Sequence, residues 1–366
     1  MFRSLFEEKC LWEKLQDEVR PIFLYGTGNG ADKILDVCND YSIKISGVFA
    51  SSGFVRNRVY RDMPVRSIDD IKAEYGDDIV VLLAFGTTLP SVIENINTIA
   101  REHTLYIPEV PLYDKALFNR EFLKENIDKI EKVYEMLSDT ESKDVFFDMI
   151  KFRYTGDGKY LSKVQTMEDM YASLLNESEI DKVLDCGAFK GDSTKEIIDA
   201  LDPSEVVCFE PDPKTFIKLQ VYADSEDRCK VIPMNFASGK ECAEVEFNTS
   251  GSRGSGFDGK NKRSKTSIIN VRTIDSLNRD DFDMIKLDVE GDEDDTITGA
   301  LKTLANSRPA LSISVYHKTS DIFEIPLRIK DIYPDYKMFM RRVPCIPAWD
   351  ISLLATPIEK EKKPFN

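Results

Sequence analysis

The sequence lacks the cysteine and histidine patterns that build disulfide frameworks and zinc sites. Its 7 cysteines are scattered, odd in number and without a Cys-x-x-Cys pair, and it has only 2 histidines. Thiols spread in this way are typical of a protein kept in a reducing compartment. We therefore expect reduced cysteines and a cytoplasmic location.

Long apolar runs and an excess of positive charge are also missing. The longest apolar run, Ile79 to Phe85, is far too short to span a bilayer, and no apolar stretch follows a basic N-terminal region. The net charge of −16 argues against a general binder of nucleic acid or anionic membranes, because phosphate contacts need clustered Lys and Arg. We expect neither a membrane span nor a nucleic-acid partner.

What the chain does have is the composition of an ordinary globular protein, with 42% hydrophobic and 31% charged residues. Its 366 residues are long for one domain, so two are expected. Strands alternate with helices in both halves, which predicts parallel sheets covered by helices on both faces. We predict an α/β protein of two Rossmann-like doubly wound domains.

The predicted boundaries follow changes in this alternation. Residues 1–113 form the first domain, residues 114–176 a charged helical connector, residues 177–357 the second domain and residues 358–366 a charged tail. The first domain is expected to open with an amphipathic helix over residues 2–20.

The second domain is expected to hold seven strands and a hairpin. The predicted strands cover residues 183–186, 206–209, 231–234, 284–287, 311–315, 337–340 and 351–355, and the hairpin pairs 244–247 with 268–271. The Ser250–Lys265 loop between the hairpin strands is expected to be a mobile tip or, alternatively, a substrate lid.

Residues 183–194 contain a strand end, a glycine turn and a helix start in that order. Asp185 stands where the strand would stop, Gly187 and Gly191 make the turn, and a helical pattern begins at Ser193. Glycine lets the backbone approach a ligand without a Cβ in the way, and a helix N-terminus offers free N–H groups. The turn is a small-ligand cradle, and by itself it suits either a phosphate or the methionine end of S-adenosylmethionine.

Polar side chains follow the later strands at the positions where each ends. Ligands of open α/β sheets bind beyond the carboxyl ends of the strands. Glu210, about 20 residues past the turn, suits acceptance of hydrogen bonds from ribose hydroxyls, although it could instead cap the next helix. Asn235 and Phe236 suit an adenine edge and face. The remaining strand-end residues are Asp288, Glu290 and His317.

Four motifs in order carry a resemblance to a known family: Asp185-x-Gly-Ala-x-x-Gly-Asp-x-Thr194, Phe209-Glu-Pro-Asp-Pro213, Thr273-Ile-Asp-Ser-Leu277 and Ile285-Lys-Leu-Asp-Val-Glu-Gly291. Over about residues 180–357 the chain resembles the FkbM family of S-adenosylmethionine-dependent methyltransferases. The resemblance implies a class I methyltransferase fold with a seven-stranded, mainly parallel sheet. It also implies methyl transfer to a hydroxyl oxygen of a sugar or polyketide-type acceptor, either a small molecule or a glycan.

The resemblance also implies roles for individual residues. Asp288 would face the methyl group, and the candidates for the general base are Asp288, Glu290 and His317. A structural hydrogen bond is a competing role for His317. The residues expected to bind the cofactor are Asp185, Gly187, Ala188, Phe189, Gly191, Ser193, Glu210, Pro211, Asn235 and Phe236.

Two further expectations concern a metal ion and the end of the last motif. In a related group of O-methyltransferases an aspartate at this strand end binds magnesium, and Asp288 with Glu290 would suit such a hard cation. The segment Asp292-Glu293-Asp294 departs from the usual Ala-Glu of the family, which bears on the substrate preference more than on the reaction.

The N-terminal glycine turn leaves several functions open. Gly26, Gly28 and Ala31 satisfy Gly-x-Gly-x-x-Gly/Ala after a strand, but the second strand runs into Ala50 and Ser51 without an acid to hold an NAD ribose. The unit weakly resembles the Rossmann-like nucleotide- or sugar-nucleotide-binding units attached to some bacterial sugar-modifying enzymes. A ligand-free scaffold or a homodimerisation domain is the alternative. For the whole chain, the alternatives to methyl transfer are an NAD(P)-dependent oxidoreductase and a non-catalytic scaffold.

Overall fold

The computed structural model describes residues 1–55, 58–111, 113–161, 167–249, 265–347 and 349–362. Within these residues the chain divides into two compact units. Unit 1 comprises Met1–Glu135, Lys143–Val164 and Pro344–Asp350, and unit 2 comprises Met136–Ser142, Gln165–Val343 and Ile351–Asn366. The predicted domain boundaries at residues 113 and 177 stay predictions.

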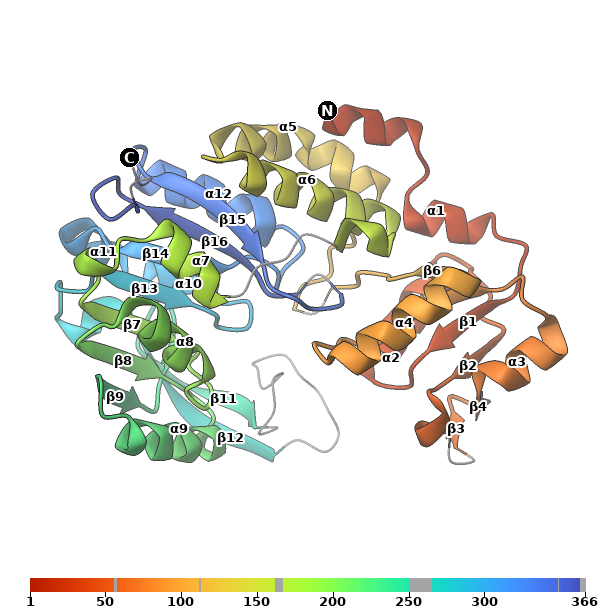
Figure 1. The fold of residues 1–366 in the computed structure, drawn as a ribbon, viewed down its shortest axis with the longest axis horizontal. Helices are drawn as coiled ribbons and strands as arrows, with labels where there is room; N and C mark the ends of the chain where they lie inside the picture. The colour runs from red at the N-terminus through yellow and green to blue at the C-terminus, as the bar shows by residue number, and fades with distance from the viewer. Residues whose placement is uncertain (56–57, 112, 162–166, 250–264, 348, 363–366) are drawn as a thin grey trace. The chain divides into compact units, whose positions relative to one another are not determined.

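Unit 1 is built on a six-stranded sheet with the order β3-β4-β2-β1-β5-β6 (Figure 1). All its strand pairs are parallel except β3 with β4. The strands are β1 (Ile22–Tyr25), β2 (Gly47–Phe49), β3 (Val59–Tyr60), β4 (Met63–Arg66), β5 (Val80–Leu83) and β6 (Thr104–Tyr106). β1 and β5 are buried along their whole length, which is why they read as continuous apolar runs.

The N-terminal helix of unit 1 differs from the prediction. The structure divides the expected helix 2–20 into η1 (Phe2–Glu7) and α1 (Leu11–Gln16). A second start is favoured at Cys10, because the Glu13 carboxylate accepts from its backbone N–H at 2.8 Å. The other helices are α2 (Asn29–Asp40), η2 (Ser52–Phe54), α3 (Ile68–Tyr75), α4 (Pro90–Glu102), α5 (Arg120–Met136), α6 (Thr140–Thr155) and η3 (Gly158–Leu161).

Unit 2 is built on a seven-stranded sheet with the order β15-β16-β14-β13-β7-β8-β9. These are the seven predicted strands, and β16 alone in this sheet runs opposite in direction to the others. Their bounds are β7 (Lys182–Cys186), β8 (Glu205–Phe209), β9 (Lys230–Met234), β13 (Met284–Leu287), β14 (Ala310–Ser314), β15 (Lys337–Arg342) and β16 (Ile351–Thr356). The predicted mainly parallel α/β fold is confirmed.

A smaller three-stranded sheet joins the predicted hairpin, with the order β10-β12-β11. Its strands are β10 (Ala237–Ser238), β11 (Ala243–Thr249) and β12 (Lys265–Arg272), and β11 pairs antiparallel with β12. Most of the loop predicted between them, residues 250–264, lies outside the described residues.

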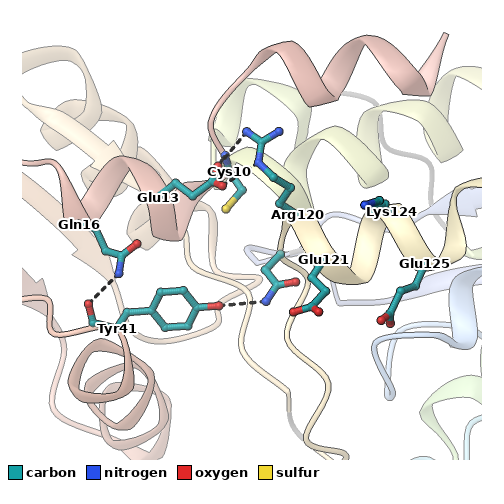
Figure 2. Close-up of a pocket in the computed structure, with 9 residues that line it drawn as sticks. Cys10, Glu13, Gln16, Tyr41, Arg120, Glu121, Lys124 and Glu125 are labelled. Carbon is teal, nitrogen blue, oxygen red and sulfur yellow. Dashed lines mark hydrogen bonds and ion pairs between the residues drawn. The ribbon is translucent and has the colours of Figure 1, made fainter.

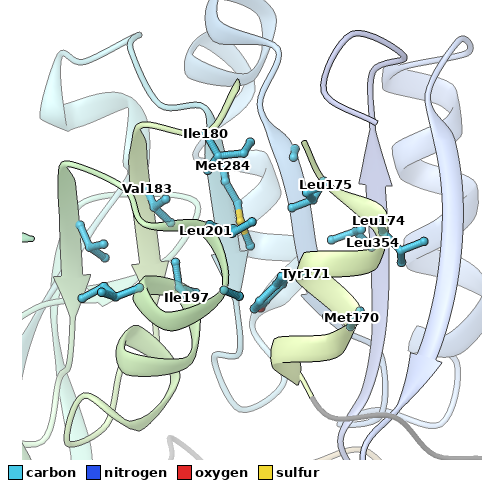
Figure 3. Packing of buried hydrophobic residues seen from close by; sticks show 14 of the residues in the cluster. Met170, Tyr171, Leu174, Leu175, Ile180, Val183, Ile197, Leu201, Met284 and Leu354 are labelled. Carbon is cyan, nitrogen blue, oxygen red and sulfur yellow. The ribbon is translucent and has the colours of Figure 1, made fainter. Parts of the chain in front are cut away.

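Helices cover the large sheet of unit 2 and close its core. They are α7 (Met167–Leu174), η4 (Glu177–Glu179), α8 (Asp192–Leu201), α9 (Pro213–Ser225), η5 (Ile274–Leu277), α10 (Glu293–Thr298), α11 (Leu301–Ser307) and α12 (Asp321–Ile332). Figure 3 shows Tyr171 of α7 and Ile197 of α8 among the buried side chains that pack against the strand residues Val183 and Met284. This packing holds the carboxyl ends of the strands in place.

Candidate functional site

The parallel strands of unit 2 bring the predicted site residues to one edge of the sheet. Asp185 of β7 is in register with Lys286 of β13 on one side and with Cys208 of β8 on the other. β13 in turn pairs with β14, where Leu287 is opposite Ile313. The segments that follow these four strands therefore leave the sheet at the same edge.

The glycine turn after β7 depends on two glycines. Gly187 has φ +89° and Gly191 has φ +96°, in the region that side chains rarely adopt. A Cβ on Gly187 would lie 1.9 Å from the carbonyl oxygen of Asp288. The turn and the β13 loop are thus in direct backbone contact. Phe189 in the same turn has φ +52°, a strained value for a residue with a side chain.

Asp185 lies below this turn and is completely buried. Its Oδ2 accepts from the hydroxyls of Ser193 and Thr194, both at 2.8 Å. Its Oδ1 lies 3.0 Å from the Nζ of Lys286, which also approaches the carbonyl oxygen of Gly187 at 3.4 Å. Asp185 therefore holds the turn to the first residues of α8. A ligand in the cradle would meet the turn backbone above it.

Lys286 is a buried charge that the sequence reasoning did not select. Burial opposes its protonation, but the carboxylates of Asp185 and Asp288 raise its pKa above the ordinary value. The signal was an isolated lysine in an otherwise apolar strand, Met284-Ile285-Lys286-Leu287. A charged side chain in a buried strand needs a partner of opposite charge within the folded protein, because burying an unpaired charge is costly.

Glu210 follows β8 and is only 6% exposed. Its Oε1 accepts from the backbone N–H of Asp212 at 2.8 Å. Burial raises the pKa of Glu210 to about 8. Glu210 does not cap the next helix. That role is taken by Asp212, whose side chain accepts from the backbone N–H groups of Lys214 and Thr215 at the start of α9.

Asn235 and Phe236 lie after β9, beside the Glu210 segment. The side-chain amide of Asn235 donates to the carbonyl oxygens of Glu210 at 2.8 Å and Pro211 at 3.1 Å. The ring of Phe236 meets that of Phe209 edge-on at 6.1 Å. The structure thus brings the two predicted nucleoside-binding segments together, and Asn235 fixes the backbone around Glu210.

Four ionisable side chains meet beyond β13 and β14. The Nδ1 of His317 is 2.8 Å from the Oε1 of Glu293. The Nε2 on the other side of the ring is 3.5 Å from the Oδ1 of Asp288 and 3.8 Å from the Oε2 of Glu290. The side chains of Glu293 and His317 are each 1% exposed, whereas those of Asp288 and Glu290 are 33% and 35% exposed. The two outer carboxylates are therefore the ones that a solute can reach.

The charged side chains of this cluster shift one another's pKa values. Burial of the His317 ring opposes protonation, but the carboxylate of Glu293, followed by those of Asp288 and Glu290, outweighs it and raises the pKa to about 10. Asp288 is also buried enough to oppose ionisation, yet Lys286 and His317 hold its pKa below the ordinary value. These shifts favour a protonated His317 ring beside an ionised Asp288.

Sequence reasoning did not select Glu293 for the site, although it named the segment. The sequence feature that pointed to Glu293 was its spacing from Glu290, with Gly291 between the two acids. Asp288, Glu290 and His317, which it did select, are brought together. The hydroxyl of Tyr316, a second residue not selected, donates to the Oδ1 of Asp288 at 3.3 Å.

The donor set does not fit the expected magnesium ion. Mg²⁺ demands near-ideal octahedral oxygen coordination. Here the Nε2 of His317 lies 3.5 Å from Asp288 and 3.8 Å from Glu290, so an imidazole nitrogen, which Mg²⁺ does not favour as a ligand, borders the same two carboxylates. Magnesium binding by Asp288 and Glu290 finds no support in this geometry.

A polar hollow on unit 1 is lined by none of the predicted site residues (Figure 2). It encloses about 680 Å³ and is lined by residues of α1, α5 and the end of α2. Its side chains bond to one another: Arg120 Nε donates to Glu13 at 2.7 Å, and Gln16 and Asn119 donate to the carbonyl oxygen and the hydroxyl of Tyr41 at 3.0 Å and 2.9 Å. These bonds tie the N-terminal helices to α5, which is a structural role.

The N-terminal glycine turn shows one close approach and one open position. A Cβ on Gly30 would lie 2.5 Å from the carbonyl oxygen of Ala84, so α2 passes tightly over the end of β5. A Cβ on Gly28 would meet no heavy atom within 4 Å. The hydroxyl of Ser51, where an NAD-binding unit carries an acid, is 2.6 Å from the hydroxyl of Tyr25.

Comparison with known proteins finds one family match, and it lies in unit 2. Residues 185–340 match the methyltransferase FkbM domain, from the buried aspartate of the glycine turn through β13 and β14 into β15. The match lies within unit 2, and over these residues the predicted resemblance to the FkbM family is confirmed.

One solved structure shares the fold over nearly the whole chain. The crystal structure of methyltransferase FkbM from Methylobacillus flagellatus KT is 19% identical, covers 97% of this chain and 96% of its own, and has a TM-score of 0.71. An rRNA methylase from Streptococcus thermophilus is 10% identical and covers 52% of this chain and 93% of its own, with a TM-score of 0.35. No curated protein matches. In the described part of the chain, no helix has the length and apolar character needed to cross a membrane.

Proposed function

We propose that unit 2 transfers the methyl group of S-adenosylmethionine to a hydroxyl oxygen of a sugar or polyketide-type acceptor, either a small molecule or a glycan. The observation that carries the proposal is the placement of the FkbM-matched segments. Within residues 185–340 the glycine turn, Glu210 and Asp288 all follow parallel strands at one edge of the sheet. That edge is where open α/β sheets bind their ligands.

The methyl donor would lie across the ends of β7, β8 and β9. The backbone of the turn at Gly187 and Gly191 would receive the methionine end, and Asp185 would support the turn from below. Glu210 would accept from the ribose hydroxyls, and Asn235 with Phe236 would border the adenine. A buried carboxylate is a strong acceptor for such hydroxyls, because few water molecules compete with them.

The acceptor hydroxyl would lie near Asp288. The hydroxyl oxygen forms a bond to the methyl carbon, the carbon–sulfur bond breaks, and its electron pair stays on sulfur. Alignment of these atoms contributes on the order of 7–11 kcal/mol. The proton of the hydroxyl passes to a carboxylate, for which the ionised and partly exposed Asp288 is suited. The step needs no group beyond the donor, the acceptor and this carboxylate.

Calorimetric titration with S-adenosylhomocysteine, the demethylated product, tests the proposal. We expect one site per chain. Glu210→Ala should weaken binding by about 1.5–3 kcal/mol, the range for hydrogen bonds to a charged group. Glu196→Ala, which removes an exposed carboxylate from α8, is the matched control and should bind as the wild type does. Absence of binding to the wild-type protein would refute the assignment of the methyl donor.

A further inference from the structure

Glu290 stands between the two ends of the proposed methyl-donor site. On one side, its Oε2 is 3.8 Å from the Nε2 of His317, in the cluster beside which the acceptor would lie. On the other side it is close to Glu210, the expected ribose acceptor: burial is the main cause of the raised pKa of Glu210, and the carboxylates of Asp212 and Glu290 add to it. In S-adenosylmethionine the sulfur joins the ribose to the methyl group, so it would lie between these two points.

The loop that carries Glu290 is fixed against the glycine turn. A Cβ on Gly187 would lie 1.9 Å from a carbonyl oxygen of this loop. Glu290 itself has φ +58°, a left-handed value that is strained for a residue with a side chain and persists where surrounding contacts impose it. The Oε1 of Glu293 supplies such contacts, because it accepts from the backbone N–H of Val289 at 2.9 Å and approaches that of Gly291 at 3.5 Å. The position of Glu290 is therefore set by both of its chain neighbours.

The Glu290 side chain can meet a ligand and is still partly enclosed. It is 35% exposed, whereas the side chains of His317 and Glu293 are each 1% exposed. Partial enclosure lowers the effective dielectric constant, so that a cation at a given distance is attracted more strongly than it is by a fully exposed carboxylate.

Negative charge predominates at this point of the sheet edge. The three carboxylates and the one ring that meet beyond β13 are those of Asp288, Glu290, Glu293 and His317. This group is negative whether or not the ring carries an extra proton. The ammonium group of Lys286 in β13 is bonded to Asp185. The edge therefore favours a ligand that brings a positive charge.

We propose that Glu290 recognises the positive charge of the methyl donor, so that the site binds S-adenosylmethionine, a sulfonium cation, in preference to its product S-adenosylhomocysteine, in which the sulfur is neutral. The inference rests on the proposed methyl transfer and adds to it the basis on which donor and product are distinguished. Glu290 is then a specificity-determining residue, and proton acceptance is left to Asp288.

Attraction to the sulfonium is compatible with the transfer step. The acceptor oxygen bonds to the methyl carbon, the carbon–sulfur bond breaks with its electron pair left on sulfur, and the hydroxyl proton passes to Asp288. The positive charge thus moves from sulfur to the acceptor oxygen and ends as a proton on a carboxylate of the same cluster, so negative side chains are near it throughout. Glu290 no longer attracts the neutral sulfur of the product, which favours product release.

Calorimetric titration of the intact protein with each of the two ligands, without an acceptor, tests the proposal. We expect the wild type to bind S-adenosylmethionine about tenfold or more tightly than S-adenosylhomocysteine, an effect between those of exposed and buried ion pairs. Glu290→Gln keeps the size but not the charge, and it should reduce this preference to about twofold or less, mainly by weakening the binding of the donor. Equal affinities in the wild type, or an unchanged preference in Glu290→Gln, would overturn the proposal.

Two further variants separate recognition of charge from support of the loop. Glu290→Asp keeps the carboxylate and should retain most of the preference, which a purely structural role of the side chain does not require. Asp294→Asn removes a charge from α10, where the side chain is 52% exposed and pairs with Arg328, and it should leave both affinities unchanged. A loss of preference as large in Glu290→Asp as in Glu290→Gln would refute recognition by charge. If Glu290→Gln does not fold, the wild-type preference and Glu290→Asp still decide.

The outcomes also separate this inference from the proposed function. Failure of the wild-type protein to bind either ligand refutes the proposed methyl transfer. Binding of both ligands with equal affinity leaves that function standing and refutes the role of Glu290 alone.

Discussion

The ammonium nitrogen of Lys286 lies 3.0 Å from the Oδ1 of Asp185, and the two side chains are 5% and 0% exposed. Lys286 belongs to the strand that leads to Asp288, and Asp185 belongs to the strand that leads to the glycine turn. This buried ion pair therefore links the strand that leads to the expected methyl-donor site with the strand that leads to the expected reaction centre.

Lys286→Met should destabilise unit 2 because it leaves Asp185 buried without its cation. Breaking one partner of a buried pair costs about 3–5 kcal/mol. Urea unfolding measures the loss. The double variant Asp185→Asn/Lys286→Met should recover part of it, since no buried charge is then left uncompensated. Lys195→Met, in the exposed pair with Asp199, is the control and should cost less than about 1 kcal/mol. Equal losses in both lysine variants would contradict this account.

Gly187→Ala should disrupt the contact between the turn and the β13 loop. The new Cβ would lie 1.9 Å from the carbonyl oxygen of Asp288, and the φ of +89° is unfavourable for alanine. The conformational strain alone is about 1–3 kcal/mol, before the clash is counted. Thermal unfolding should show a large loss of stability. Gly28→Ala, at an open position in the turn of unit 1, should show almost none. An unchanged melting temperature in Gly187→Ala would count against the contact.

Binding of S-adenosylhomocysteine should depend on pH through Glu210. Its pKa of about 8 keeps the carboxyl protonated at neutral pH, whereas ribose hydroxyls donate to the ionised form. Binding should therefore release a proton, and below this pKa the affinity should rise by up to about tenfold per pH unit. Calorimetry in buffers of different ionisation enthalpy detects the proton. Glu210→Gln should bind more weakly and lose the pH dependence.

The raised pKa of Glu210 also affects the stability of the ligand-free protein. Because the folded chain holds this proton more tightly than the unfolded chain, the contribution of Glu210 to the free energy of unfolding falls as pH rises from about 4.5 to about 8. Glu210→Gln should gain stability relative to the wild type above this range and show no such gain below it. A constant difference across the range would contradict the raised pKa.

Asp288→Asn should lower turnover by about 10²-fold or more, because the amide keeps the size of the side chain but takes up no proton. The affinity for S-adenosylhomocysteine should stay close to that of the wild type. Release of S-adenosylhomocysteine in the presence of a methyl acceptor measures turnover. Asp294→Asn serves as the control on the neighbouring helix. Full activity in Asp288→Asn would favour the non-catalytic scaffold.

Unit 1 should not bind NADH, because Ser51 offers a hydroxyl already bonded to Tyr25 where a ribose-binding acid is needed. Fluorescence titration with NADH is the measurement. Gly28→Val is the informative variant, since a Cβ at this position meets no neighbour and the fold should tolerate it. Micromolar NADH affinity in the wild type that is lost in Gly28→Val would support the oxidoreductase alternative.

The strand pattern and the position of the site could be read from the sequence. Each strand of the large sheet is a short apolar run, and strands separated by helices pair in parallel, so their ends meet at one edge. Asp288, Glu290 and His317 were selected because they follow two such runs, those of β13 and β14. The helix break at Cys10 was missed, because the amphipathic pattern of residues 2–20 continues across it.

The sequence by itself determined which residues reach the carboxyl edge of the sheet, because alternation and turn chemistry act over a few neighbouring residues. Only the tertiary structure decided what those residues do there. Lys286 meets Asp185 across 101 positions of the chain, and Glu293 meets His317 across 24. The protonation of Glu210 and of His317 depends on burial and on charges contributed by other strands and helices. These electrostatic interactions between residues distant in the sequence form only when the chain has folded.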